Sequence, residues 1–527
     1  MTYGRLQLKM HTNSAARLCS AILIHFAWCF CVCAASATSD KQGNICCLNL
    51  VKNLPGIVFF YNTSQYGDSV GSYYSGQEGD IRPSCIVAPR DREDVSAAVR
   101  ILTTASYEQE IFNQSQTHCK FAIRSGGHTP YAGSANIAGG VTIDLRGLNQ
   151  IVVNDAGDAT YVGPGALWGE VYDTLDPQNL TVVGGRSRYV GVGGLLTGGG
   201  ISYFSPRFGF ACDNVLSYEV VLADGSIVIA SSTDYSDLFA SLKGGSSTFG
   251  IVTRFELRTF AQGLMWGGDI MYSLTTLPQQ TKAFIDFATD PNYDEHTSLI
   301  QVYVATQGRR LVINSPIYTK PEPYPQAYRR FTDIKPQVSD ATRIGSHADM
   351  VADSETSQGK RNAFLTTTWR ADLSFLDQHV IPAWLAFSNI TANVSGLTNA
   401  LLSQTLANPI LTQSARHSTF ARNIVPDPTA ASGAPPIISM LSLTWNDAAD
   451  DELMSTAAKT FIQSVESASK KYGNYIKFKY LNYADREQDV FGGYDRENVE
   501  KMKKASRKYD PQGIFQTAVP GGFKIFP

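Results

Sequence analysis

The chain has 527 residues, 43% of them hydrophobic, and its 44 Lys and Arg nearly balance its 47 Asp and Glu, which gives a formal net charge of −3. This size leaves room for two or three units with their own hydrophobic core. The sequence has no basic excess and no run of Lys and Arg, which excludes the usual kind of nucleic-acid-binding surface.

The N-terminus has the pattern of an export signal. Lys9 and Arg17 precede an apolar stretch from Leu18 to Ala35, and small residues at Ala35-Ser36-Ala37 offer a site for signal peptidase. We therefore predict a signal peptide over residues 1–37 and a secreted protein. The alternative is a membrane anchor, because the stretch approaches spanning length. No later stretch of the sequence is apolar for long enough to span a bilayer.

The cysteines and the glycosylation motifs agree with export. Five cysteines follow the predicted signal, and because five is odd, at least one stays free or pairs between chains. No CxxC spacing occurs, so the sequence predicts no metal site. We predict a disulfide from Cys46 or Cys47 to Cys119 in an oxidising compartment. N-glycosylation motifs occur at Asn62, Asn113, Asn179, Asn389 and Asn393.

The first periodic segments predict a strand, a helix and two further strands. Cys85–Val87 and Phe121–Ile123 are β-like, and Asp91–Leu102 between them repeats apolar residues at helical spacing. The turn Arg124-Ser125-Gly126-Gly127-His128 follows, and Val141–Leu145 is the next predicted strand. Two glycines after a strand can point backbone N–H groups at an anion. A plain turn between strands has the same composition and is the alternative.

A second glycine-rich block covers residues 190–215, after a predicted strand at Thr160–Gly163 and a predicted helix at Trp168–Leu175. The block allows two interpretations, a buried bend between closely packed elements or a backbone that contacts a large flat ligand. The glycines that begin at Gly163 and Gly191 do not complete a GxGxxG motif, so a nicotinamide cofactor is not indicated.

The remaining chain combines hairpins, long strands and helices. Asp224-Gly225 predicts a hairpin turn, and Leu277–Ala288 is helical in pattern. We expect an antiparallel sheet from the alternating strands Ile300–Thr306, Arg310–Ile317 and Ile437–Trp445. Phe478–Asp485 is predicted to be an aromatic-rich strand. Four isolated histidines are expected to be ordinary surface or core residues: His296, His347, His379 and His417.

Seven motifs follow one another between Cys85 and Leu257: RSGGH, GxGxxW, VGVGG-GGG, FGxxxDNV, VVLADG, DLF-LKGG and FGIVT. In this order they resemble the berberine bridge enzyme-like FAD-linked oxidoreductases, also called vanillyl-alcohol oxidase-like or PCMH-type, in their fungal secondary-metabolism branch. The resemblance implies an α+β fold with a PCMH-type FAD-binding domain at residues 38–258. It also implies a substrate domain at 259–475, in which helices cover an antiparallel sheet, and a segment at 476–527 that returns to the FAD domain.

The resemblance assigns cofactor residues as well. In the family the histidine that matches His128 is bonded to the 8α-methyl of the flavin, and many plant members add a bond from a cysteine where this chain has Ser187. We therefore expect FAD attached through His128 alone. Val190 matches the position that controls access of dioxygen, and valine there implies an oxidase. The other residues expected to contact FAD are Arg124, Ser125, Gly126, Gly127, Ser134, Gly193, Gly194, Gly198, Gly199, Ile201, Gly250, Ile251 and Val252.

The segment FKYLNYAD resembles the part of the family that returns to the flavin. Tyr483 then matches a tyrosine base, with Tyr480 and Asn482 beside it. A free tyrosine has a pKa of about 10, so a nearby positive charge or hydrogen-bond donor must favour its phenolate. No feature of the sequence identifies that group.

The resemblance implies oxidation of a small secondary metabolite, with a hydride passing to the flavin and dioxygen restoring it to give hydrogen peroxide. Alcohol oxidation, desaturation and oxidative cyclisation are the expected reactions. One alternative is an oligosaccharide oxidase on the same scaffold, and another is a secreted flavin-binding or ligand-binding protein without activity. A narrow apolar cavity would count against the oligosaccharide alternative. The sequence does not predict an oligomeric state.

Overall fold

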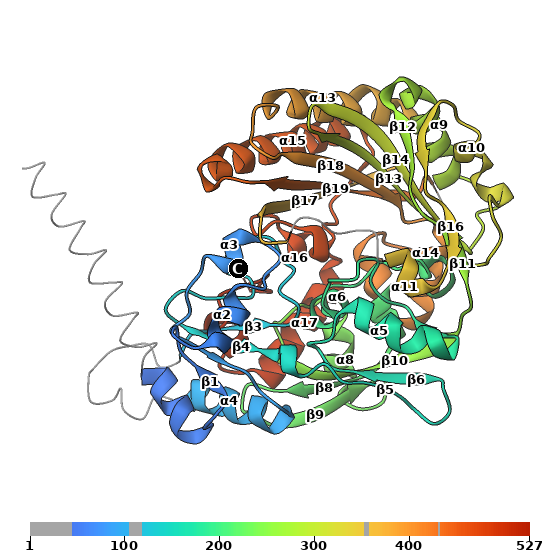
Figure 1. Ribbon diagram of the computed structural model, residues 1–527. Coiled ribbons are helices and arrows are strands. Elements are labelled where there is room, and N and C mark those ends of the chain that lie inside the picture. The colour runs from blue at the N-terminus through green and yellow to red at the C-terminus, as the bar shows by residue number, and fades with distance from the viewer. Residues whose placement is uncertain (1–44, 105–118, 352–357, 430–432, 527) are drawn as a thin grey trace, which may run out of the picture.

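A computed structural model of the protein describes residues 45–104, 119–351, 358–429 and 433–526. The predicted signal peptide and the glycosylation motif at Asn113 lie outside these residues. In Figure 1 the N-terminal half of the chain forms the lower part of the molecule, and a large sheet with helices on its outer side forms the upper part. The expected α+β fold, with an antiparallel sheet covered by helices, is confirmed.

The first sheet of the lower part has four strands in the order β1-β2-β4-β3. The last three of these are parallel, because the helix α4 (Arg92–Thr104) carries the chain from β2 across to β3. β2 and β4 are buried along their whole length, as parallel strands covered on both faces are. The strands are β1 (Val58–Phe59), β2 (Cys85–Val87), β3 (Phe121–Arg124) and β4 (Val141–Asp144).

The second sheet of the lower part is antiparallel, with the order β5-β6-β10-β8-β9 and with β7 beside β10. Its hairpin β8–β9 turns at Asp224-Gly225, as the sequence predicts, and Gly225 has a φ of 79°. The strands are β5 (Ile151–Val153), β6 (Ala159–Val162), β7 (Leu180–Val182), β8 (Val215–Val221), β9 (Ile227–Ser231) and β10 (Ile251–Ala261).

Helices of the N-terminal half are short, apart from α4. The predicted helix at Trp168–Leu175 is present as α5 with those bounds. The others are α2 (Ser64–Val70), α3 (Gly76–Gly79), α6 (Val192–Thr197), α7 (Ser205–Phe208) and α8 (Ser236–Leu242).

The upper part is one ten-stranded antiparallel sheet, ordered β15-β12-β14-β13-β18-β19-β17-β20, with β11 beside β14 and β16. Its strands are β11 (Met265–Gly267), β12 (Ile270–Ser273), β13 (Thr297–Thr306), β14 (Arg309–Tyr318), β15 (Gln337–Asp340), β16 (Arg343–Gly345), β17 (Arg361–Arg370), β18 (Thr398–Thr405), β19 (Pro436–Trp445) and β20 (Tyr475–Ile476).

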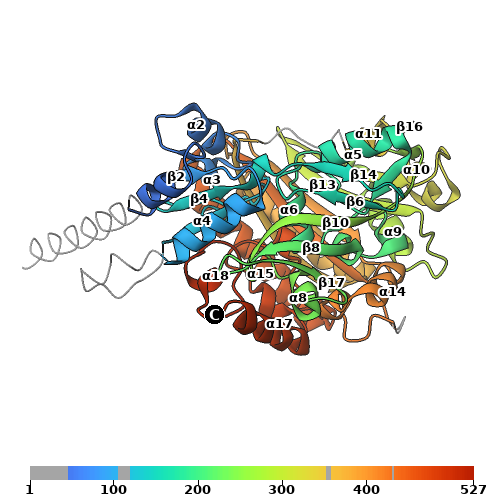
Figure 2. The ribbon, with the colours of Figure 1, turned by 90° about the horizontal axis from the view of Figure 1, so that it is seen from below.

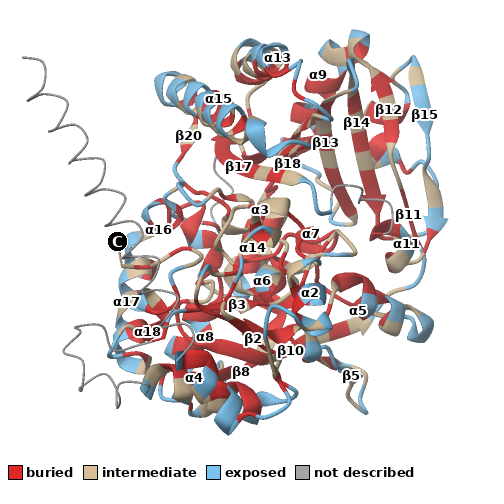
Figure 3. Ribbon diagram, turned by 60° about the vertical axis from the view of Figure 1, so that its left-hand side comes forward, coloured by how far each residue is buried: buried red, intermediate tan, exposed pale blue. Residues whose placement is uncertain are grey.

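Helices cover the outer face of this sheet (Figure 1). On α15 the buried residues Met454, Ala458, Phe461 and Val465 recur at helical spacing, and they belong to one core with strand residues such as Trp369. The opposite side of α15 is exposed (Figure 3). The covering helices are α9 (Leu277–Ala288), which has the predicted bounds, α10 (Arg329–Thr332), α12 (Leu373–Phe375), α13 (Ile381–Ile390) and α15 (Asp451–Tyr472).

Two shorter helices of the second half lie nearer the lower part, namely α11 (His347–Val351) and α14 (Asn408–His417). The chain then ends beside its N-terminal half. The helix α17 (Arg496–Tyr509) packs against α8 (Figure 2). Lys508 and Tyr509 of α17 both bond to the Asp237 carboxylate there. Along the chain, α17 lies between α16 (Val490–Gly493) and α18 (Ile514–Thr517). The domain boundaries drawn from the sequence remain predictions.

One predicted strand is wrong. Of the chain around Phe478–Asp485, only Tyr475–Ile476 pairs in a sheet, as β20, and Leu481–Tyr483 forms a 3-10 turn. The aromatic rings explain the difference, because Phe478 and Tyr480 are buried in the core of the lower part. Packing of these rings therefore overrides their preference for a strand.

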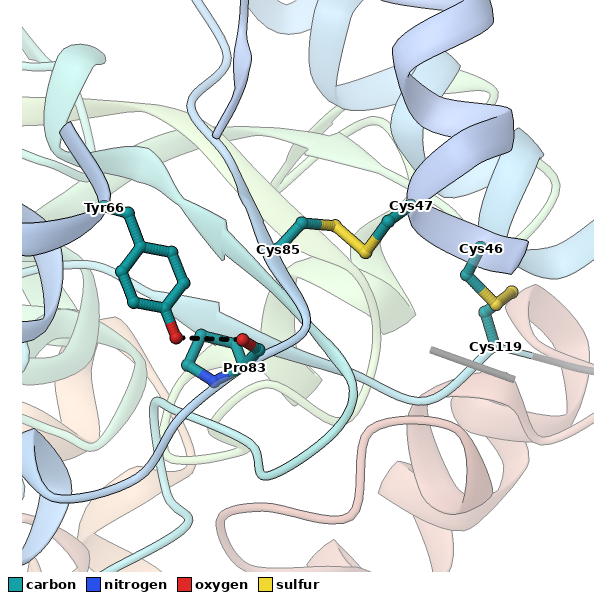
Figure 4. Close-up of a disulfide and its surroundings, with 6 residues drawn as sticks. All are labelled: Cys46, Cys47, Tyr66, Pro83, Cys85 and Cys119. Atoms are coloured by element: carbon teal, nitrogen blue, oxygen red, sulfur yellow. Dashed lines mark hydrogen bonds between the residues drawn. A yellow bond between two sulfur atoms is a disulfide. The ribbon is translucent and has the colours of Figure 1, made fainter. Parts of the chain in front are cut away.

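Two disulfides hold the N-terminal segment to the lower part (Figure 4). Cys46 pairs with Cys119, one of the two predicted pairings, while Cys47 pairs with Cys85, which the sequence analysis missed. Adjacent cysteines on the helical residues 45–53 can reach β2 and the segment before β3 because their side chains point in different directions. Cys212 is free and buried, in agreement with the odd count.

Candidate active site

A cavity of about 440 Å³ lies between the two parts of the molecule. Glycine-rich loops of the lower part form one wall, which we call the glycine face and define as residues 125–128, 190–191, 193–194 and 250–252. Strands of the upper sheet form the opposite wall, which we call the sheet face and define as Ile300, Phe364, Leu402, Met440 and Ser442. Residues 480–484 close the space between the two faces.

Two backbone segments touch on the glycine face. A Cβ atom on Gly126 would lie 2.7 Å from the Gly191 Cα, and a Cβ on Gly191 would lie 2.5 Å from the Gly126 nitrogen. These positions therefore need glycine for close approach. A Cβ on Gly194, in contrast, would meet no atom within 4 Å, because this residue faces the open cavity.

His128 stands at the end of the predicted turn and lines the cavity. Gly127 before it has a φ of 69°, a left-handed conformation that favours glycine. The His128 ring stacks on the ring of Tyr74, with centroids 3.9 Å apart and an interplanar angle of 15°. The stacking fixes the plane of the imidazole at the cavity wall.

Arg124 lies beneath this turn and does not line the cavity. Its buried guanidinium donates to the hydroxyl oxygens of Ser69 and Ser72 at 3.1 and 2.9 Å and lies 3.7 Å from the centre of the Tyr73 ring. Burial lowers the pKa of Arg124. This arginine supports the turn from the core.

Gly198 and Gly199 also lie outside the lining, although they were expected to contact FAD. Gly198 leaves room for the Asn482 amide, and Gly199 leaves room for the Phe420 ring. The residues expected at the cofactor that do line the cavity are His128, Ser125, Gly126, Gly127, Ser134, Val190, Gly193, Gly194, Ile201, Gly250, Ile251 and Val252.

Tyr480 has its hydroxyl turned to the backbone of the glycine-rich block. The phenol oxygen accepts hydrogen bonds from the N–H groups of Gly200 and Ile201 at 2.9 and 3.0 Å, and from the Asn482 amide at 3.1 Å. Burial raises the pKa of Tyr480 well above its ordinary value. Asn482 also donates to the Leu195 carbonyl at 3.1 Å. Tyr480 and Asn482 therefore fix the returning segment on the glycine face.

Tyr483 has a different environment. Its phenol oxygen accepts a hydrogen bond from Arg186 Nη2 at 2.6 Å, and Arg186 Nη1 donates to Gln404 Oε1 at 2.5 Å. The Tyr480 ring packs edge-on against the Tyr483 ring, with centroids 4.8 Å apart. The Arg186 guanidinium thus places a positive charge beside the Tyr483 hydroxyl, and the sequence analysis missed this residue. Its position directly before Ser187, at the second anchoring site of the family, was the available signal.

The sheet face follows from the pairing of three strands. Phe364 of β17 is opposite Ser442 of β19, and Leu402 of β18 is opposite Met440 of β19, so these side chains share one face. Their sequence neighbours point to the helix-covered core on the other side, among them Leu365, Leu401 and Leu441. Because both faces of these strands mix apolar with polar residues, the alternation that identifies a strand did not show which residues line the cavity.

Four other described histidines lie outside the cavity lining, namely His296, His347, His379 and His417, and their assignment as ordinary residues stays a prediction. Among the described residues that line the cavity, His128 is the single histidine. His347 is buried against the Tyr172 ring, with centroids 3.7 Å apart, and burial lowers its pKa to about 3. No group of three or more His, Cys, Asp or Glu in the described ranges could hold a metal ion.

Comparisons with known proteins identify the family of this chain. Residues 83–231 match the FAD binding domain family. The FAD-dependent monooxygenase drtC of Aspergillus calidoustus is 35% identical over 484 residues, which cover 91% of this chain and 90% of the relative. This chain belongs to the berberine bridge enzyme-like FAD-linked oxidoreductases. A further relative of this oxidoreductase, the FAD-dependent monooxygenase sdcF of Emericella nidulans, is 34% identical over 489 residues, 91% of this chain and 98% of the relative.

Solved structures share the fold of this oxidoreductase. 6-Hydroxy-D-nicotine oxidase of Arthrobacter nicotinovorans superposes with a TM-score of 0.69 at 21% identity, covering 88% of this chain and 96% of that enzyme. Berberine bridge enzyme of Eschscholzia californica superposes with a TM-score of 0.68 at 16% identity, covering 90% and 99%. The expected family and fold are thus confirmed.

The cavity of this oxidoreductase fits FAD. Gly126 and Gly191 bring two backbone segments of its wall into contact, and Gly194 beside them faces open space. The described lining residues include no carboxylate, so the two phosphates of FAD would meet no like charge there. Glu78 supports this wall from behind, because its carboxylate accepts from the Gly133 and Ala135 N–H groups at 2.9 and 2.6 Å, on the two sides of the lining residue Ser134.

Proposed function

We propose that this FAD-linked oxidoreductase is a secreted oxidase that carries its cofactor on His128 alone. Its reaction would be alcohol oxidation, desaturation or oxidative cyclisation of a small secondary metabolite. The observation that carries the proposal is that His128 and the Arg186–Tyr483 pair line one cavity. Ser187 lines the same cavity and cannot form the thioether that a cysteine would add.

The chain's own residues supply binding and proton transfer. When bound, FAD supplies a two-electron acceptor that dioxygen returns to its oxidised state. Tyr483 receives the substrate proton at its phenol oxygen, and the Arg186 guanidinium stabilises the negative charge there. Gln404 holds Arg186 in place, and Tyr480 with Asn482 holds the segment that carries Tyr483. Val190 lines the cavity where dioxygen would reach the cofactor.

Secretion is supported by the two disulfides, which persist in oxidising compartments. Within the described residues, no helix is both long and apolar enough to cross a membrane. The glycosylation motifs at Asn62, Asn179, Asn389 and Asn393 all lie at exposed positions. Treatment of the secreted protein with an endoglycosidase would lower its mass if these sites carry glycans.

The covalent attachment is tested by acid precipitation. We expect a yellow pellet from the native protein and from His417→Ala, whose histidine is exposed and outside the cavity lining. His128→Ala should release its flavin to the supernatant. Native flavin in the supernatant would refute the covalent bond, and a yellow His128→Ala pellet would place the bond elsewhere.

The fate of dioxygen separates two reactions. The fungal relatives are named monooxygenases, so insertion of one oxygen atom into the substrate is a second candidate. With labelled dioxygen, an oxidase gives one hydrogen peroxide per turnover and an unlabelled product, whereas a monooxygenase gives a labelled product.

Tyr483→Phe should slow reduction of the cofactor by 10²-fold or more, roughly the contribution of a positioned base.

Two other candidates have less support. One similar fold is that of a chitooligosaccharide oxidase, but four of the five residues of the sheet face here are apolar, and Ser442 alone among them can bind a hydroxyl group through its side chain. A ligand-binding protein without activity would not need Tyr483 beside Arg186. Bound flavin without turnover of any alcohol, phenol or sugar substrate would support that last candidate.

A further inference from the structure

The last residues of the chain form part of the cavity wall. Gly522 and Phe523 line the cavity, although they lie far beyond residue 231, where the match to the FAD binding domain ends. They stand beside lining residues of two loops of the lower part, one between β3 and β4 and the other between α8 and β10. We call residues 521–526 the C-terminal strap. The strap closes the cavity where a loop from the first lower sheet meets a loop from the second.

Two glycines let the strap approach both loops closely. A Cβ atom on Gly521 would lie 2.2 Å from the Gly133 carbonyl oxygen, so the two backbones are in direct contact. Gly522 has a φ of 72°, a left-handed conformation that favours glycine, and its Cβ would lie 3.7 Å from the Ser247 hydroxyl oxygen. Two successive residues therefore carry the strap from the first loop to the second.

Side chains after the two glycines hold the strap in place. Phe523 is only 9% exposed, and its ring meets the Tyr131 ring edge-on, with centroids 6.0 Å apart. Lys524 Nζ donates to the Phe515 carbonyl oxygen at 3.0 Å, and Ile525 is buried in the same core as Phe523. The strap is thus packed and hydrogen-bonded as a fixed part of the wall.

The position of the strap indicates which part of FAD it meets. FAD is long, with the flavin ring at one end and adenosine at the other. His128, the expected attachment point of the flavin ring, lies near the rings of Tyr74 and Phe364, where the two parts of the molecule meet. The strap instead touches Gly133 and the carbonyl of Ser134 within the lower part. The adenosine half, which extends away from His128, is therefore the half that reaches the strap.

The groups at this end of the cavity suit adenosine. Phe523 and Tyr131 present aromatic rings, which pack well against a purine. The hydroxyl groups of Ser246 and Ser247 also line the cavity there, and they can bond to ribose or phosphate oxygens. The strap thus completes an aromatic and hydroxyl-bearing pocket from three separate segments of the chain.

We propose that the C-terminal strap is part of the cofactor site and that Phe523 contacts the adenosine half of FAD. The proposal goes beyond the proposed function, because it concerns only how FAD is held. It depends neither on a bond to His128 nor on the reaction catalysed. Changes in the strap should accordingly weaken the binding of FAD and leave the binding of FMN, which has no adenosine, unchanged.

The test compares FAD with FMN in full-length proteins that carry His128→Ala and hold either flavin without a covalent bond. Equilibrium dialysis, read by flavin fluorescence, measures the affinity for each. Phe523→Ala in this background should weaken FAD binding about tenfold or more, since an aromatic ring stacked on a base contributes that much affinity. FMN binding should stay the same. Deletion of residues 521–527 should weaken FAD binding further and again leave FMN binding unchanged.

Two further variants separate contact with the cofactor from a general effect on folding. Phe526→Ala is the matched control, because it removes the same side chain from a residue that does not line the cavity and packs under the Arg507 guanidinium, 5.0 Å from its ring centre. It should bind both flavins as His128→Ala alone does. Gly521→Ala leaves Phe523 intact but should lift the strap off the Gly133 carbonyl, and it should weaken FAD binding only.

Three outcomes would overturn the proposal. These are unchanged FAD affinity in Phe523→Ala and Gly521→Ala, equal weakening of FAD and FMN, or an equal loss of FAD affinity in Phe526→Ala. If Phe523→Ala does not fold, Gly521→Ala decides by the same comparison of FAD with FMN. Failure of the proposed function is distinguishable, because acid precipitation of protein that retains His128 tests the covalent bond separately.

Discussion

The glycine face and the sheet face border the same cavity, but they are built by opposite means. On the glycine face, backbone meets backbone, as where Gly126 and Gly191 touch, and side chains are absent by necessity. On the sheet face, side chains such as Phe364 and Met440 project from strands whose backbone bonds are already complete. The first face can change little without collapse, while the second can change its side chains and keep its strands.

The support behind the two faces differs as well. Disulfides, the buried Arg124 and the Glu78 carboxylate stand behind the glycine face. An apolar core under α9, α13 and α15 stands behind the sheet. We therefore expect changes near the glycine face to alter stability and cofactor retention together, and changes on the sheet face to alter ligand choice.

Of the changes to the two faces, removal of a disulfide behind the glycine face should lower the unfolding free energy most. The Cys46→Ser/Cys119→Ser double variant opens a link between residues 73 apart in sequence, which should cost about 4 kcal/mol of unfolding free energy from chain entropy. Chemical unfolding of the native and double-variant proteins measures the loss. An unchanged midpoint would show that the covalent link does not stabilise the glycine face.

Glu78 should make the stability of the glycine face depend on pH. Burial raises the pKa of Glu78 from 4.5 to about 7, although nearby Arg124 and the backbone N–H groups oppose the shift. Because the folded pKa is the higher one, this contribution to stability is present below pH 4.5 and is lost as the pH rises through about 7. The loss is on the order of 3 kcal/mol. Unfolding of native protein and Glu78→Gln at several pH values tests this, since the variant should lack that decline.

Two glycine substitutions on the glycine face compare a position in close backbone contact with a position that faces open space. Gly191→Ala should destabilise the fold by about 2 kcal/mol, because its Cβ would overlap the Gly126 backbone. Gly194→Ala should stay within about 0.5 kcal/mol of native stability, since its Cβ enters open space, yet it should hold less flavin. Thermal unfolding and flavin content are the measurements. Equal stability of the two variants would contradict the close contact.

The sheet face should show the smallest effect on folding. Phe364→Ala is expected to cost about 1 kcal/mol, less than a buried ring elsewhere, because this ring already borders a cavity. Its affinity for ligands of the cavity should fall while its covalent flavin content stays native. Loss of flavin from Phe364→Ala would show that the sheet face also retains the cofactor.

Local signals in the sequence predicted elements in both parts of the molecule. α5 and α9 begin and end where their apolar periodicity does, and the β8–β9 hairpin turns at its Asp-Gly pair. The glycines of the RSGGH turn and the VGVGG block were also evident, because close approach of two backbones restricts residue type. The FKYLNYAD segment was misjudged, since its rings pack into a core that lies far away in the sequence.

The sequence by itself determined the family, the FAD-binding scaffold and the histidine and tyrosine at which chemistry is expected, because each depends on residues that lie close together in the chain. Only the tertiary structure decided that Arg186 meets Tyr483, 297 residues later, and that Gln404 holds it. It also showed that Phe364, Leu402 and Met440 form the opposite wall. Such contacts depend on how strands pair and how the two parts pack, and neither leaves a periodic pattern in the sequence.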